Sequence, residues 1–204
     1  MTIALKMTAV TVLMAVGIST ALAGTDAHVD ITGNVTPVSC NLGPGVAAVK
    51  NIFLGNAAPG DFQKGGGGAL YARLYTVPAS LHAFPVTVDG CAGVAPVKDS
   101  ELLVRVNANG NIVGTSADKL FGGGYGQQSS AGATLAAKDR PGLRGVKTLL
   151  GDGDEVVAYI YKDNENASAA NGSTVLFETM MASTGQRPAP GGIDAPITFT
   201  VDYK

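Results

Sequence analysis

The chain has 204 residues with 14 basic and 16 acidic side chains, and its formal net charge is −2. It has no cluster of Lys or Arg, which argues against nucleic acid as a partner. The 28 glycines and the scattered Asn-Gly and Asp-Gly pairs are typical of a turn-rich chain of short strands, and they leave little room for helices.

Residues 1–23 have the pattern of a secretory signal peptide. Lys6 precedes an apolar run over residues 7–18, and the small-residue site Ala21 to Ala23 stands before Gly24. The run is shorter than the roughly 20 apolar residues that a membrane-spanning helix needs, and no later stretch approaches that length. We therefore expect an exported, soluble product that begins at Gly24.

The stretch from Val29 to Cys40 alternates between apolar and polar side chains, which predicts a strand. Val29, Ile31 and Val35 share one face, and Gly33 lies on the same face. A glycine inside a strand usually marks a point where another backbone or a shallow pocket comes close. The pattern predicts a strand that lies in a groove, and the alternative is the first edge strand of an ordinary β-sandwich.

Cys40 and Cys91 are the two cysteines of the chain. An even count in an exported protein favours one disulfide. It would close a loop of about 50 residues, worth about 4 kcal/mol in the chain-entropy model. Metal binding is disfavoured, because only His28 and His82 could add ligands and neither stands at ligand spacing from a cysteine.

Several further segments have strand-like alternation or β-branched composition. Strands are predicted at residues 52–55, 83–88, 101–108, 143–150 and 156–161. The four glycines from Gly65 to Gly68 predict an exposed flexible loop. A phosphate-binding loop is disfavoured, because it would need a strand before the glycines, a helix after them and a lysine, and the sequence has none of these here. Residues 122–132 predict another loop.

Two polar segments in the second half predict surface turns. Asp152 to Glu155 has alternating acidic residues, but it lacks the rest of the EF-hand pattern and favours a hairpin turn over a calcium loop. Residues 163–173 predict a polar surface loop, and the sequons at Asn166 and Asn171 indicate exposure.

The last part of the chain predicts two strands of different kinds. Thr174 to Ala182 has apolar residues on both parities, as expected for a central strand. After a Pro- and Gly-rich loop at 185–196, residues 197–204 alternate to the end. The apolar residues of this last strand are Ile197, Phe199, Val201 and Tyr203. About seven to nine strands are expected, enough for an Ig-like sandwich, yet the terminal amphipathic strand leaves an edge that something must cover.

These motifs together resemble the shaft subunits of chaperone-usher pili, particularly the major pilins of type 1 fimbriae. The matching segments are, in order, V-x-I-x-G-x-V-x-x-x-x-C at 29–40, Phe53 to Gly55, Phe84 to Val88 before Cys91, Phe177 to Gly185, and the terminal strand with Tyr203 next to last. The chain departs from the family through an insertion at Gly65 to Tyr75, and Ala117 to Leu150 aligns poorly.

The resemblance implies an all-β fold, an Ig-like sandwich that lacks its final strand. It also implies a donor-strand extension at residues 24–36 and a pilin domain at 37–204. In that family a periplasmic chaperone fills the groove, and the extension of the next subunit then replaces it. Carried over here, the donor face is Val29, Ile31, Gly33 and Val35, and one groove wall and chaperone-facing strand is Ile197, Phe199, Val201 and Tyr203.

The leading interpretation is a non-enzymatic structural subunit that needs no metal or cofactor. It would pass through the periplasm and polymerise head to tail into an adhesive fimbrium on the bacterial cell surface. Its partners would be neighbouring pilin subunits, a periplasmic chaperone and an outer-membrane usher. The alternative is a minor or adhesive pilus subunit that binds a host glycan or protein through loops such as 71–75 or 122–128.

A secreted β-sandwich enzyme is a third hypothesis. The chain has only two histidines, no G-x-S-x-G motif and no obvious group of carboxylates. These features disfavour catalysis.

Overall fold

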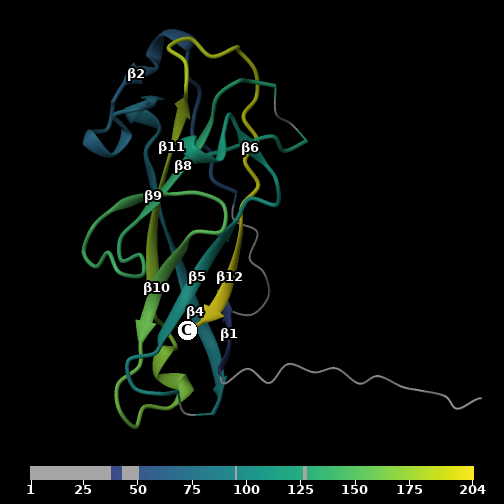
Figure 1. Ribbon diagram of the computed structural model, residues 1–204. Helices are drawn as coiled ribbons and strands as arrows, with labels where there is room; N and C mark the ends of the chain where they lie inside the picture. Colours follow the sequence, from purple (N-terminus) through teal and green to yellow (C-terminus); the bar gives the residue numbers. More distant parts are fainter. Residues whose placement is uncertain (1–37, 43–50, 95, 126–127) are drawn as a thin grey trace, which may run out of the picture. The chain divides into compact units, whose positions relative to one another are not determined.

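The computed structural model describes residues 38–42, 51–94, 96–125 and 128–204 (Figure 1). Within these ranges the regular structure is antiparallel strands and short 3-10 turns, which confirms the predicted all-β fold class. No helix there is long and apolar enough to cross a bilayer. The predicted signal peptide and the donor face lie outside the described residues.

One sheet is built around β11 (Thr174–Ser183), which lies between β4 and β8 as its two-sided apolar pattern predicted. From β1, the path through this sheet is β1-β4-β11-β8-β7-β6, and β2, β3 and β9 join its margins. The bounds are β1 (Val38–Leu42), β2 (Gln63–Lys64), β3 (Tyr75–Thr76), β4 (His82–Gly93), β6 (Ile112–Val113), β7 (Leu120–Phe121), β8 (Gly132–Ala137) and β9 (Thr148–Leu150).

The second sheet has the order β10-β5-β12, with β10 at Glu155–Ile160, β5 at Glu101–Asn107 and β12 at Thr198–Tyr203. The strands predicted at 101–108, 156–161 and 197–204 are therefore confirmed. Within the described ranges β12 is an edge strand of this sheet. Its outer edge is free of strand pairing there.

The main core lies between the two sheets and is held by an aromatic group. The ring centroid of Phe177 on β11 is 5.7 Å from that of Phe84 on β4 and 4.7 Å from that of Phe199 on β12. Phe177 has no exposed surface. Phe199 therefore packs the edge strand β12 of one sheet against the central strand β11 of the other.

Two strand predictions differ from the structure for different reasons. The predicted strand at residues 52–55 is not formed, and no described strand lies beside this segment, although Ile52 and Leu54 are half-buried against the core. β8 was not predicted, since its six residues are all buried and mostly small, so they show no alternation. Of the predicted strand at 143–150, only β9 is formed.

The Gly65 to Gly68 segment is a turn in which Gly67 and Gly68 are exposed, as expected, but its backbone is also tied to the chain around it. The Gly65 N–H donates to the Leu74 carbonyl at 2.8 Å, and both Tyr71 and Leu74 are buried. A Cβ on Gly67, whose φ is +91°, would lie 3.0 Å from the Met180 methyl and 3.1 Å from the Tyr71 ring. The glycine run thus allows the insertion to lie close against β11.

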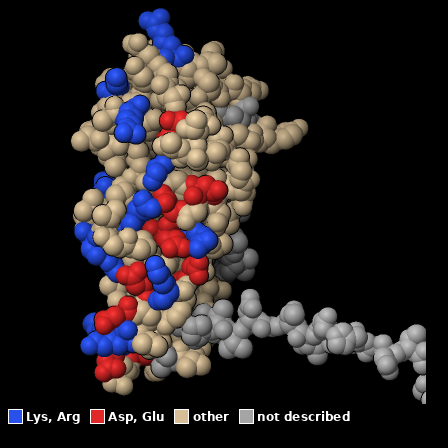
Figure 2. Space-filling model, viewed as in Figure 1, with Lys and Arg blue, Asp and Glu red and all other residues tan. Residues whose placement is uncertain are grey.

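The acidic segment before β10 is a turn but not the predicted hairpin, because the two strands that it joins do not pair with each other: β9 pairs with β8, and β10 pairs with β5. Asp152 accepts a hydrogen bond from the Ala108 N–H at 2.7 Å, and Asp154 pairs with Lys119 at 2.9 Å and with Arg140. Figure 2 shows acidic and basic side chains intermingled on this face. The carboxylates thus have protein partners, and no group of three metal-ligating side chains occurs among the described residues.

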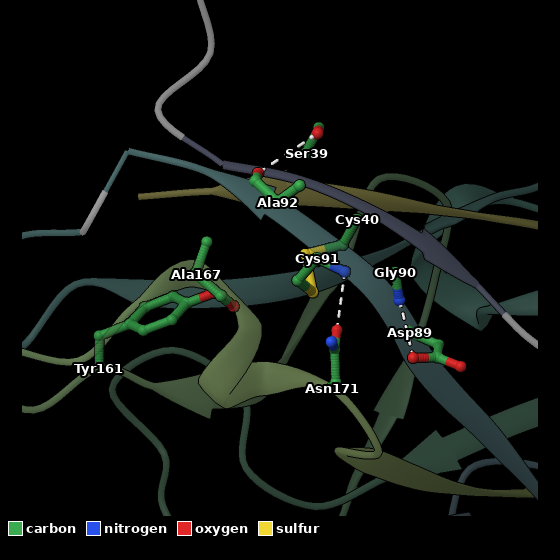
Figure 3. Close-up of a disulfide and its surroundings, with 9 residues drawn as sticks. All are labelled: Ser39, Cys40, Asp89, Gly90, Cys91, Ala92, Tyr161, Ala167 and Asn171. Atoms are coloured by element: carbon green, nitrogen blue, oxygen red, sulfur yellow. Dashed lines mark hydrogen bonds between the residues drawn. A yellow bond between two sulfur atoms is a disulfide. The ribbon is translucent and has the colours of Figure 1, made fainter.

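The Cys40–Cys91 disulfide is present and joins β1 to β4 (Figure 3). The Cys91 N–H donates to Asn171 Oδ1 at 2.7 Å, and the Tyr161 hydroxyl donates to the Ala167 carbonyl at 3.2 Å. Burial raises the pKa of Tyr161 to about 12, so the hydroxyl stays protonated as a donor. The predicted loop at 163–173 therefore packs on the disulfide region, while the sequon residue Asn171 stays exposed.

Replacing Phe177 with alanine is expected to lower the free energy of unfolding by about 3 to 5 kcal/mol, because a large buried ring is lost. The neighbouring Leu176 is 57% exposed on the other face of β11, so Leu176→Ala should change stability by less than about 0.5 kcal/mol. Urea unfolding of both variants tests the assignment of faces, and equal effects would contradict it.

Candidate strand-binding groove

A groove of about 1080 Å³ runs along the core between two backbone segments, residues 51–57 and residues 188–199. Its floor comes from three strands of the large sheet. The floor side chains are Phe84 and Val86 of β4, Ala133 and Leu135 of β8, and Thr179 and Met181 of β11. The floor is therefore almost wholly apolar.

One wall continues the alternation of β12 upstream of the strand itself. Its inward residues, all half-buried and packed on the core, are Ile193, Ala195, Ile197 and Phe199. Two of the four predicted wall residues, Ile197 and Phe199, thus line the groove. The other two, Val201 and Tyr203, pack on the core beyond this lining, where β1 lies beside β12.

The backbone N–H and C=O groups of β12 point alternately towards β5 and towards the free edge of the strand. The Glu101 and Lys204 backbones exchange both hydrogen bonds, at 2.8 and 3.0 Å. Because bonded pairs alternate in an antiparallel ladder, every second residue back from Lys204 also faces β5. Phe199 and Val201 therefore turn their N–H and C=O groups to the free edge while their side chains face the core.

The opposite wall, residues 51–57, is irregular chain with a positive φ at Gly55, and it pairs with no described strand. Ile52 and Leu54 pack on the core, whereas Phe53 is 75% exposed. The groove thus has an unpaired backbone segment on each side. A strand laid along it would pair with backbone and place alternate side chains on the apolar floor.

A loop at residues 122–130, here the brace loop, holds the wall at residues 188–194, here the rim. The N–H of Gln128 and that of Ser129 both donate to the Gly192 carbonyl, at 2.9 and 3.0 Å. The Ser129 hydroxyl donates to the Ala189 carbonyl at 2.6 Å, and the Ala189 N–H donates to Ser130 Oγ at 2.8 Å. The sequence marked this region only as a loop, because contacts across about 60 residues leave no local pattern.

Scans against protein-family models and against curated proteins give no match. Among solved structures, the chain resembles the P pilus rod subunit PapA, with 15% sequence identity and a TM-score of 0.43. The match covers 87% of this chain and 99% of that chain.

Gly191→Ala is expected to displace the rim. Gly191 has a φ of +144°, and an added Cβ would lie 2.7 Å from the Gln128 Cβ and 2.9 Å from its backbone carbon. The loss of stability should be about 1 to 3 kcal/mol, measured by urea unfolding. The control Gly185→Ala meets no atom within 4 Å and should be neutral. A neutral Gly191→Ala would mean that the brace loop does not fix the rim.

Proposed function

We propose that this protein is a non-enzymatic structural subunit of a surface fibre and that it polymerises by strand donation. The groove of one copy takes the N-terminal extension of the next. The observation that carries the proposal is the apolar groove beside β12, whose outer edge pairs with no strand of the described ranges. An open sheet edge beside an apolar groove is a template for an added strand.

The extension has side chains that suit this groove. With Val29, Ile31 and Val35 on one face, burial of three apolar side chains contributes about 5 to 9 kcal/mol as an upper estimate. That is comparable with the total stability of an ordinary domain, about 5 to 15 kcal/mol. Gly33, on the same face, brings its bare backbone close to the groove floor.

A second copy is a better source of this strand than the same chain. The extension joins Val38, at the end of β1 opposite to the groove-lining Leu42. Only Thr36 and Pro37 lie between Val35 and β1, and a proline restricts the residue before it to extended conformations. A two-residue link that includes a proline leaves little room for the extension to fold back onto its own domain, so we take the donor to be another copy, which gives a head-to-tail, open-ended polymer.

The remaining parts of the proposal rest on the resemblance of the sequence motifs to chaperone-usher pilins. Before assembly a periplasmic chaperone covers the groove, and an outer-membrane usher passes the subunits to the bacterial surface. The resulting fimbrium serves adhesion. Ile197, Phe199, Val201 and Tyr203 form the chaperone-facing strand, and Val29, Ile31, Gly33 and Val35 form the donor face.

A copy of residues 26–36 appended after Lys204 through a short flexible linker is expected to give a soluble monomer with a much higher melting temperature. The appended strand fills the groove, so its apolar face leaves water. The same appended segment carrying Gly33→Leu should stabilise far less, because the added side chain meets the floor. Thermal unfolding of the three proteins tests this, and equal melting temperatures would show that the sandwich is already closed.

Gly33→Leu in the native extension is expected to block fibres while leaving the domain folded. The leucine either overpacks the groove, at about 1 to 3 kcal/mol, or shifts the strand by one residue, which turns all three apolar side chains outward. Electron microscopy counts the fibres, and the periplasmic subunit is assayed for its disulfide. Normal fibres would contradict a groove-facing Gly33, and loss of the folded subunit would assign Gly33 to the fold of its own domain.

A further inference from the structure

Tyr125 is a fully exposed aromatic side chain on the brace loop. The neighbouring Gly124 donates its N–H to the Asp194 carbonyl at 3.0 Å, so the backbone beside Tyr125 is tied to the rim. Exposed single apolar residues are ordinary on protein surfaces. This one, however, stands at a fixed place next to one end of the groove.

The donated strand leaves the groove at this same end. Towards the end of β12, β1 lies beside it, and the groove lining stops at Phe199. The other end is bordered by the loop residues of the rim. A strand antiparallel to β12, which is the sense of every pairing in the described sheets, has its C-terminal end at the rim.

The donor domain must then lie close to the rim, because its connection to the strand is short. Three peptide links separate Val35 from Val38, so their Cα atoms lie at most about 11 Å apart. Val38 is the direct partner of Gly93 in the β1–β4 ladder. The part of the donor domain around Gly93 is therefore the part that meets the rim of the acceptor.

That part of the domain presents two exposed apolar side chains. Val94 is 70% exposed and Val97 is 75% exposed, on the connection that follows β4. Val94 comes directly after Gly93, so it lies beside the root of the extension. The short connection thus places Val94 and Val97 of the donor copy close to Tyr125 of the acceptor copy, at the junction between the two domains.

We infer that Tyr125 of one copy packs against Val94 and Val97 of the next copy, as a second contact between their domains. The inference rests on the proposed strand donation. The contact buries an aromatic ring with few rotatable bonds against aliphatic side chains, at low cost in side-chain entropy. It limits rotation of one domain on the other about residues 36–37, and it stiffens the fibre at each joint.

Cysteine pairs test this contact in assembled fibres of the full chain. Cys40 and Cys91 are bridged and the described residues include no free cysteine, so added thiols are selective targets. Fibres of Tyr125→Cys/Val97→Cys treated with a short bismaleimide should give a ladder of covalent multimers on denaturing gels. The matched control Leu176→Cys/Val97→Cys, with its exposed thiol on the outer face of β11, should stay monomeric.

The outcomes separate this inference from the function on which it rests. No fibres from the unmodified protein would contradict strand donation itself. Normal fibres with no Tyr125–Val97 ladder, or with an equal ladder in the control, overturn only the joint. In addition, Tyr125→Cys should lose maleimide labelling in fibres relative to the monomer with the appended strand. Undiminished labelling would leave the ring free for a host ligand and would overturn the contact.

Discussion

The edge of β12 over the core is the constraint on which the rest of this structure depends. Phe199 is held against Phe84 and Phe177 of the opposite sheet, so the strand cannot move away to close the sandwich elsewhere. At the same time the backbone groups of Phe199 and Val201 face an edge that is hydrogen-bonded to no strand of the described ranges, although β1 lies beside the end of β12. Under the proposed strand donation, this edge of β12 specifies where the added strand lies and which face its side chains use.

The two walls of the groove are held from behind and not across it. The Cys40–Cys91 bridge fastens β1 to β4, and β1 ends at Leu42 in the groove lining. On the other side, the brace loop hydrogen-bonds to the rim. Fastenings of this kind restrict the movement of backbone beside the groove, and a more rigid site lowers the entropy cost of binding a strand.

Sequence alternation was sufficient wherever a strand has one apolar face or a partner on both sides. It located β5, β10, β11 and β12, and the resemblance added Ile197 and Phe199 as wall residues. It did not locate β8, whose small buried residues have no alternation. It also overstated residues 52–55, which pair with no strand in the described part of the chain. The brace loop depends on hydrogen bonds between distant segments, which no local pattern reveals.

Under the proposed strand donation, some residues would contribute to both folding and assembly, and others to assembly alone. Phe199 serves both, since it packs on Phe177 and also lines the groove, so a change there alters the fold and the bound strand together. Tyr125 is exposed and contributes little to its own domain. Residues of the floor and wall are therefore constrained by folding, whereas the exposed residues beside the rim are free to respond to the geometry of the fibre alone. A difference in fibre stiffness between two such subunits would then arise at the rim, with the groove unchanged.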